Sequence, residues 1–304
     1  MRSFNILRIY IRKLWRIFIL GINKLSPVFA TKILHYRITG QWVNLKNPRD
    51  FNEKLQWIKL NEDNRVKADL ADKFLAYKYV ESKCGKSILN NLIAVYDNPT
   101  EIDWSMMPEK VAIKCTHGCG YNIVTKDKSL LDKGSVERKL TKWMGEKFGR
   151  EGLEYHYDFI VPRVIVEEYI EDSHGLLPRD YKVYCFNGKA KLVLVCSDRD
   201  EGLKLDFFDL DWNRLNIGLK KNESEKDILR PGCLDEMVKY AEILASGFRF
   251  VRIDFYDKDG SAIFGEFTFT PARNMASYYN EFGLKYLGEL LELNVSSRSD
   301  RVIS

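Results

Sequence analysis

Apolar residues recur at helical spacing in several segments of the chain. Phe51, Leu55 and Ile58 lie three and four residues apart, which places them on one face of a helix. A second segment of this kind covers residues 234–246. Pro231 before it and Gly247 after it are typical signals for the start and the end of a helix. The pattern predicts helices over residues 47–60, 72–80, 135–148 and 234–246.

Runs of β-branched and aromatic residues alternate with these helices. Asn187-Gly188 and Asp259-Gly260 mark hairpin turns between neighbouring runs. Consecutive hairpins with interspersed helices predict an α+β fold with antiparallel sheets rather than a doubly wound parallel sheet. The expected strands cover residues 111–114, 164–170, 181–186, 190–196, 205–210, 250–256 and 262–269.

Residues 3–30 are apolar and aromatic, but basic residues interrupt them. Arg8, Arg12 and Arg16 repeat every four residues, so they would form a basic stripe along a helix. No uncharged run reaches the roughly 18–20 residues of a membrane span, and the charges lie too deep for a signal peptide. The segment fits a helix in peripheral contact with an anionic membrane, through residues 1–30. It fits equally a terminal helix packed on its own domain with one solvated face.

The composition is ordinary for a globular protein, with 45 % hydrophobic and 30 % charged residues in 304. A net charge of +5 is too small to indicate nucleic-acid binding. Six scattered cysteines without a secretory leader predict reduced thiols in a cytoplasmic protein. Cys115 and Cys119 suggest a metal site, but a second ligand pair at suitable spacing is missing.

The strongest chemical signal is a predicted hairpin whose strands have one apolar and one polar face. Arg252 and Asp254 alternate with apolar residues on the first strand, and Glu266 and Thr268 do so on the second. A three-residue loop at 259–261 would set Asp254 opposite Glu266 and Arg252 opposite Thr268. Facing carboxylates repel unless a cation lies between them, and Mg²⁺ typically takes one or two carboxylates together with phosphate oxygens. A solvated polar face with local Arg–Asp pairing is the alternative, and a two-residue Asp-Gly turn would break this register.

Two further segments carry weaker signals. Lys114 ends an apolar strand and is followed by Gly118 and Gly120, whose backbone N–H groups could approach a phosphate. An ordinary turn is the alternative, and no Walker A motif is present. The strand at 164–170 becomes acidic at Glu167. Such an edge could bind an adenine through backbone groups and a ribose through the acid, and it is equally an ordinary strand end.

In order and spacing, several short motifs together resemble the ATP-grasp superfamily. The most similar subfamily is the one associated with teichuronopeptide and other surface-polysaccharide biosynthesis, and the resemblance spans about residues 36–294. The motifs are Gly40-Gln-Trp-Val-Asn-Leu-Lys-Asn-Pro, Phe51-Asn-Glu-Lys-Leu-Gln-Trp, Leu70-Ala-Asp-Lys, Lys114-Cys-Thr-His-Gly-Cys-Gly, Glu167-Glu-Tyr, Asp180-Tyr-Lys-Val-Tyr-Cys-Phe-Asn-Gly, Val251-Arg-Ile-Asp and Gly265-Glu-Phe-Thr-Phe-Thr-Pro.

The resemblance implies roles for individual residues. Arg252 and Lys182 would be catalytic, with Arg252 neutralising acyl-phosphate oxygens. Asp254, Glu266 and Thr268 would hold Mg²⁺, although many family members have Asn where this chain has Thr268. The residues implied in ATP binding are Lys73, Lys114, His117, Gly118, Gly120, Glu167, Glu168, Tyr169 and Lys182. Arg273 and Asn274 follow the motif that begins at Gly265, but the resemblance assigns no role to them.

The implied fold is an ATP-grasp fold, in which two α+β subdomains clasp ATP behind a helical amino-terminal region. The expected segments are 1–35 and 36–70 (helical), 71–168 (lid subdomain) and 169–304 (metal-site subdomain). The implied activity is ATP-dependent carboxylate–amine ligation, joining an amino acid to a uronic acid or amino sugar of a bacterial surface polysaccharide. Asp209-Leu-Asp211 suggests a nucleotide-sugar glycosyltransferase instead, and a non-catalytic nucleotide-sensing or membrane scaffold is a further alternative.

Overall fold

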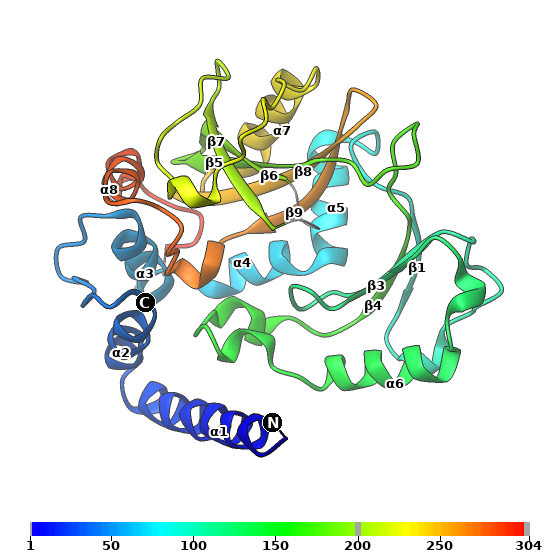
Figure 1. Ribbon diagram of the computed structural model, residues 1–304, viewed down its shortest axis with the longest axis horizontal. Helices are drawn as coiled ribbons and strands as arrows, with labels where there is room; N and C mark the ends of the chain where they lie inside the picture. The colour runs from blue at the N-terminus through cyan, green and yellow to red at the C-terminus, as the bar shows by residue number, and fades with distance from the viewer. Residues whose placement is uncertain (1, 198–201, 301–304) are drawn as a thin grey trace.

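Two antiparallel sheets, each covered by helices, form the body of the chain (Figure 1). The computed structural model describes residues 2–197 and 202–300, apart from the side chains of residues 2–9 and 12. The helices are α1 (Arg2–Leu25), α2 (Pro27–Thr39), α3 (Phe51–Asn61), α4 (Asn64–Ala71), α5 (Lys73–Cys84), α6 (Lys133–Met144), α7 (Leu234–Ala245) and α8 (Glu281–Leu290). The strands are β1 (Leu92–Tyr96), β2 (Val111–Cys115), β3 (Asn122–Thr125), β4 (Val164–Glu168), β5 (Asp180–Phe186), β6 (Lys189–Ser197), β7 (Lys204–Asp209), β8 (Phe250–Lys258) and β9 (Ser261–Thr268). This confirms the predicted α+β class with antiparallel sheets.

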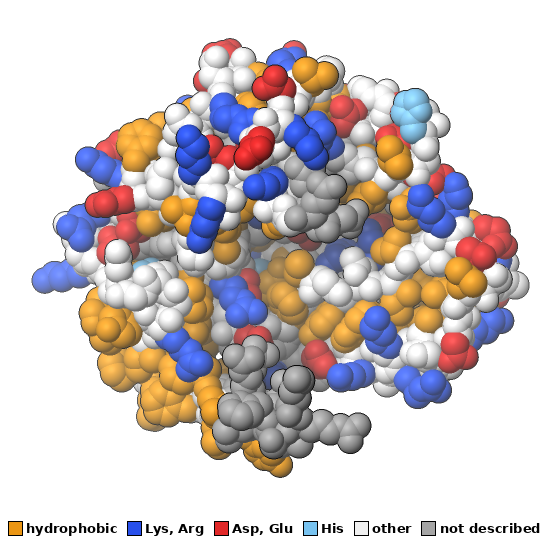
Figure 2. All heavy atoms as spheres, viewed as in Figure 1, with side chains coloured by type: hydrophobic (Ala, Val, Ile, Leu, Met, Phe, Trp, Pro, Cys, Tyr) orange, Lys and Arg blue, Asp and Glu red, His pale blue; other side chains and the backbone are white. Residues whose placement is uncertain are grey.

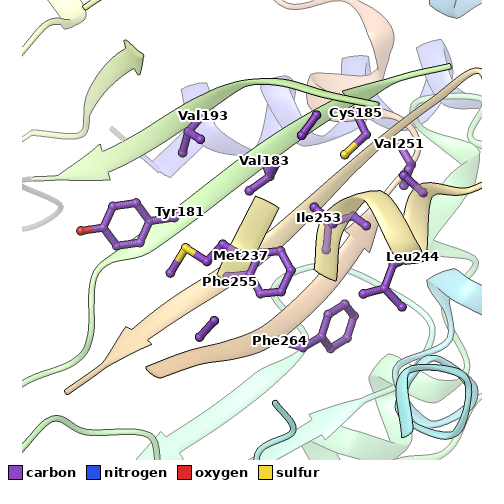
Figure 3. Packing of buried hydrophobic residues seen from close by; sticks show 14 of the residues in the cluster. Tyr181, Val183, Cys185, Val193, Met237, Leu244, Val251, Ile253, Phe255 and Phe264 are labelled. Carbon is purple, nitrogen blue, oxygen red and sulfur yellow. The ribbon is translucent and has the colours of Figure 1, made fainter. Parts of the chain in front are cut away.

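The larger sheet has the strand order β7-β6-β5-β8-β9. One of its faces packs against α7, and Figure 3 shows Val183, Ile253 and Phe255 of the sheet beside Met237 and Leu244 of that helix. Because side chains alternate along a strand, the residues between these project to the opposite face. The larger sheet therefore has one face that belongs entirely to the core.

The opposite face changes character along its length. At one end, Tyr184 and Phe186 of β5 are buried under α3 and α8 with Phe51 and Leu287. At the other end the same face of β5 and β8 carries Asp180, Lys182 and Asp254, which none of the described helices covers with apolar side chains. The polar end of this face is free to form one wall of a cleft.

The smaller sheet has the strand order β1-β4-β2-β3. Val111 and Ile113 of β2 point into a core that also contains Val136 and Leu140 of α6. The alternate β2 residue Lys114 therefore lies on the face away from α6, where it lines a cavity together with residues of the larger sheet. Figure 1 shows the larger sheet and α6 on opposite sides of the smaller sheet. The strands of the two sheets fall within residues 92–168 and 180–268.

Helix starts follow from polar capping residues. Asp72 accepts hydrogen bonds from the backbone N–H groups of Phe74 and Leu75, so α5 begins at Lys73. Asp50 caps α3 in the same way. The predicted helices and strands are all present, with ends that differ by a few residues. The sequence analysis did not identify β1, β3, α4 or α8, and it did not separate α2 from α1.

The β8–β9 hairpin corrects one prediction and confirms another. The loop has two residues, because Lys258 pairs with Ser261, and Asp259 and Gly260 both have positive φ, as a tight hairpin turn requires. The expected three-residue loop is therefore wrong. A bulge at Gly265 inserts one extra residue, and beyond it Asp254 again pairs with Glu266 and Arg252 with Thr268. A Cβ atom at position 265 would lie 3.0 Å from the Asp254 carbonyl oxygen, so the bulge suits glycine.

Candidate ATP-binding cleft

A cavity of about 510 Å³ lies between the two sheets. Figure 2 shows the surface hollowed between the upper and lower right parts of the molecule. Of the residues predicted to form the site, those that line this cavity are Lys73, Lys114, Gly120, Glu167, Glu168, Tyr169, Lys182, Arg252, Asp254 and Glu266. A larger hollow of about 1250 Å³ between α2, α3 and residues 155–159 is lined by none of the predicted residues.

Asp254 is the centre of a buried charge cluster on β5 and β8. Arg252 donates to both of its carboxylate oxygens, over 2.6 and 2.7 Å, and Lys182 Nζ lies 2.5 Å from Oδ2. Burial opposes ionisation of Asp254, but the charges of Arg252 and Lys182 outweigh it and hold its pKa below the ordinary value. Asp254 is therefore an anion fixed in place by two cations.

Asp180 extends this cluster, and the sequence analysis gave it no role. Its carboxylate lies 2.6 Å from Lys182 Nζ, so Lys182 bridges two acids. Burial and the neighbouring charge of Asp254 raise the pKa of Asp180, whereas Asp254 and Asp180 together raise the pKa of Lys182 against its burial. The signal was available in the sequence, because Asp180 precedes Lys182 by two residues and a strand puts both on one face.

Glu266 is the more accessible carboxylate of the facing pair. Its side chain is 38 % exposed, compared with 4 % for Asp254, and its nearest contacts are Thr268 Oγ1 at 3.5 Å and Arg252 Nη2 at 3.8 Å. Thr268 accepts a hydrogen bond from Arg252 over 3.0 Å and is not among the residues that line the cavity. Glu266 thus has carboxylate oxygens available to a ligand in the cleft.

The donor set fits a metal shared with a ligand rather than one held by protein alone. Within residues 2–197 and 202–300, no group of three His, Cys, Asp or Glu side chains could hold a metal ion. Asp254 and Glu266 supply two facing carboxylates, which is the protein contribution that Mg²⁺ usually receives when phosphate oxygens complete its coordination.

The opposite wall of the cleft belongs to β2 and β4. Lys114 Nζ lies 2.5 Å from Glu167 Oε2, and the two residues come from paired strands. Glu168 and Tyr169 follow at the end of β4 and also line the cavity. A lysine and an acidic strand end therefore face the Asp254 cluster across the cavity.

The loop after β2 is held by Lys73, whose ammonium group donates to the carbonyl oxygen of Gly118 over 2.6 Å. A Cβ atom at Gly118 would lie 2.9 Å from Phe148 and Tyr121, so only glycine fits there. Gly120 has φ +77° and lines the cavity. The loop therefore approaches the cleft with its backbone.

His117 lies behind this loop rather than in the cavity. It is buried, its Nε2 atom is 3.0 Å from the Trp143 carbonyl oxygen, and burial lowers its pKa. Gly118 likewise does not line the cavity.

Two other segments singled out in the sequence lie elsewhere. Asp209 accepts hydrogen bonds from Asn213 within its own turn and is not part of the cavity lining. Asn274 is buried and donates to the Leu55 carbonyl oxygen, and Arg273 lies 3.6 Å from Glu151. All six cysteines are free, as predicted.

The match to a family model decides the classification. The model described as TupA-like ATPgrasp matches residues 53–292, which is most of the chain. The chain belongs to the TupA-like ATP-grasp family. Membership confirms the resemblance to the ATP-grasp superfamily and the fold class that the resemblance implied.

Several solved ATP-grasp structures are similar to this ATP-grasp protein at low identity. D-alanine–D-alanine ligase from Bacillus anthracis complexed with ATP is 14 % identical, with 76 % of this chain and 67 % of that chain covered and a TM-score of 0.47. ATP-grasp ligase PsnB complexed with minimal precursor, Mg and ADP is 12 % identical, with coverages of 78 % and 63 % and a TM-score of 0.41. D-cycloserine synthetase DcsG is 15 % identical, with coverages of 74 % and 70 % and a TM-score of 0.40. A search of curated protein sequences gives no match.

Proposed function

We propose that this ATP-grasp protein binds Mg·ATP in the cleft and uses it to join a carboxylate to an amine through an acyl phosphate. The observation that carries the proposal is the pairing of Asp254 with Glu266 across the β8–β9 hairpin. Beside this pair lie Arg252 and Lys182, and across the cavity lies Lys114. Two facing acids among fixed cations form a site for a divalent cation and a polyphosphate together.

The balance of charge supports a requirement for the metal. The described residues that line the cavity include four cationic side chains and five carboxylates. Lysines and arginine alone therefore do not make the cleft attractive to the tetra-anion ATP. Mg²⁺ held by Asp254 and Glu266 would reverse the sign of the cleft and provide charge neutralisation at the phosphates.

The residues support a two-step reaction. A carboxylate oxygen attacks the γ-phosphorus of ATP, a carboxyl O–P bond forms, and ADP leaves. Lys114, Lys182 and Arg252 offset the negative charge that spreads over the phosphoryl oxygens. An amine then attacks the acyl carbon, the amide C–N bond forms, phosphate leaves and the amine gives up a proton. The Gly118–Gly120 loop would exclude water, which otherwise hydrolyses the acyl phosphate.

For the substrates, we propose an amino acid and a uronic acid of a bacterial surface polysaccharide or its precursor. An amino sugar in the glycan would reverse which partner supplies the amine. The support for this assignment is the similarity to the polysaccharide-associated subfamily, since the cleft itself explains only the nucleotide and the metal.

The test is a thermal-shift titration with ATP analogues, ADP and nucleotide-sugars, each with and without Mg²⁺. A ligand that binds only the native state raises the melting temperature as its occupancy increases. We expect stabilisation by adenine nucleotides that requires Mg²⁺ and is weakened about 10-fold or more in apparent affinity by Lys114→Ala. Stabilisation by nucleotide-sugars alone would instead support glycosyl transfer and overturn the proposal.

Lys110→Ala is the matched control. Lys110 precedes β2 and pairs with Glu171 as Lys114 pairs with Glu167, but it does not line the cavity. Removing this lysine should leave the nucleotide response unchanged. An equal loss in both variants would mean that Lys114 acts only through its ion pair.

A further inference from the structure

Charge is distributed very unevenly along the chain. Residues 1–49 contain ten Lys and Arg residues and no Asp or Glu. Residues 50–304 contain the other 38 basic residues and all 43 acidic ones, so the net charge of +5 combines +10 at the amino-terminal end with −5 elsewhere. The cationic part coincides with α1, α2 and the segment that follows them.

Helix α1 has two different apolar faces. Ile19 on the inner face is 1 % exposed and packs with Leu34, Leu153 and Met275. The outer face is also apolar, although it faces solvent. We call this outer set the apolar arc: Tyr10 (61 % exposed), Ile11 (52 %), Leu14 (65 %), Ile17 (61 %) and Phe18 (53 %).

The apolar arc is continuous and has a cationic border. At 3.6 residues per turn its five side chains fall within about 120° of the helix circumference. Lys13 and Lys24 follow directly beside it on one edge, and both are exposed. Arg16, from the predicted basic stripe, is exposed as well, whereas the side chains of Arg8 and Arg12 lie outside the described residues.

Helix α2 and the loop after it extend this surface. Phe29, Tyr36 and Trp42 are 52, 48 and 60 % exposed, and the last two rings stack at 4.7 Å. Figure 2 shows apolar side chains gathered along the lower left of the molecule, where α2 and α1 lie in Figure 1. An exposed apolar patch of this kind marks an interaction surface.

We propose that α1 and α2 dock this protein on an anionic lipid surface, with the apolar arc in the headgroup region. An apolar stripe with Lys along one edge, together with exposed Trp and Tyr, is the pattern of a helix that lies in the plane of a membrane interface. The excess of +10 favours anionic headgroups, each nearby Lys or Arg adding attraction. Among the described helices, none has the length and hydropathy needed to cross a bilayer.

Docking in this orientation leaves the fold intact. The inner face of α1 is already occupied by Leu153 and Met275. Met275 follows Pro271–Asn274, the short segment that continues the chain from β9 and Glu266. A lipid surface that holds α1 would therefore be linked, through the contact of α1 with Met275, to the segment that follows β9 and the cleft residue Glu266.

The test is co-sedimentation of the full chain with vesicles of phosphatidylcholine alone or of phosphatidylcholine with phosphatidylglycerol. We expect binding to the anionic vesicles that decreases with salt. The double substitution Leu14→Ser/Ile17→Ser should weaken it about 100-fold, and Lys13→Ala/Lys24→Ala about 30-fold. The matched control is Leu130→Ser/Leu229→Ser, which removes two leucines that are 79 and 80 % exposed outside this surface, and it should bind like the unaltered chain.

Three results would overturn the proposal. Equal binding to both vesicle types would show that charge does not contribute to binding. Unaltered binding of Leu14→Ser/Ile17→Ser would show that the apolar arc does not contact the lipid. A stable dimer in sedimentation velocity that this double substitution converts to monomer, without vesicle binding, would show that a second copy covers the surface. Stabilisation by Mg·ATP is expected in all these variants, so failure here is separable from failure of the proposed activity.

Discussion

The nucleotide cleft and the amino-terminal helices use charge in opposite ways. In the cleft, Asp254 is buried and each of its carboxylate oxygens contacts a cation. On the helices, Lys13 and Lys24 are exposed, and none of the described ion pairs includes them. A buried charge requires partners because desolvation is costly, whereas a solvated one does not. The position of Asp254 in the cleft is therefore fixed by individual contacts. On the helices, any attraction for a charged partner comes from the summed charge of many solvated residues.

The largest expected effect is that of Asp254→Asn. This change removes an anion from between Arg252 and Lys182 and leaves two buried cations with incomplete pairing, which should lower the free energy of unfolding by about 3 kcal/mol. Loss of this proposed metal ligand should also weaken Mg²⁺-dependent ATP binding about 100-fold. Denaturant titration and calorimetric ATP titration measure the two effects separately.

Glu266→Gln is the matched comparison, because Glu266 faces Asp254 but is 38 % exposed. It should weaken Mg·ATP binding by a similar factor and change stability by less than about 1 kcal/mol. Unaltered Mg·ATP binding in either variant would contradict the metal assignment. Equal destabilisation by Asp254→Asn and Glu266→Gln would contradict the inference that burial and ion pairing make Asp254 the more important of the two for stability.

The facing of Asp254 and Glu266 shows how far sequence reasoning reached. The alternation of polar and apolar residues identified the polar face, and this is a local property of each strand. The loop length was wrong by one residue, and a bulge at Gly265 compensated for it. A bulge is set by the backbone path of two strands together, so a pattern within one strand does not reveal it.

What the sequence analysis missed has a different origin. Strand β1 has five residues, all half-buried, and it pairs only with β4 at the edge of the smaller sheet. Its sequence, Leu-Ile-Ala-Val-Tyr, is a short apolar run without alternation, which does not distinguish a strand from a segment of buried helix. Asp180 received no role although its spacing from Lys182 puts both on one face of β5, and only the pairing of β5 with β8 brings Asp254 beside them. The motifs predicted residues that line one cavity, whereas the pairing of β5 with β8 required tertiary structure.

His156 is intermediate between these two regions, because it is a buried basic group that forms an ion pair with none of the described carboxylates. It is 1 % exposed, and burial, with a smaller effect of nearby Lys67, lowers its pKa to about 3. The unfolded chain takes up a proton below a pKa of about 6.5, whereas the native protein does not until about 3. Above pH 6.5 His156 is neutral in both states and does not make the free energy of unfolding depend on pH. Between pH 6.5 and about 3 the unfolded chain binds one more proton, so the free energy of unfolding falls by about 1.4 kcal/mol for each unit that the pH falls.

The variant His156→Phe should remove this contribution while retaining an aromatic ring beside Tyr157 and Phe269. The measurement is the slope of unfolding free energy against pH between about 6 and 4. We expect the slope to be smaller in the variant, whatever its absolute stability. An unchanged slope would mean that His156 is protonated in the native state and has found a partner.

The smallest expected effect is the change in stability when exposed lysines of α1 are removed. Lys13→Ala/Lys24→Ala removes two exposed cations that stabilise no described carboxylate, so the free energy of unfolding should change by less than about 0.5 kcal/mol. The comparison is Lys182→Ala, which leaves Asp180 and Asp254 buried side by side and should be strongly destabilising. Denaturant titration of both variants distinguishes charge that holds the fold together from charge that acts on a partner. A marked loss of stability in Lys13→Ala/Lys24→Ala would show that α1 is tied to the rest of the protein by its lysines, and its cationic edge would then be structural rather than a surface for anionic lipid.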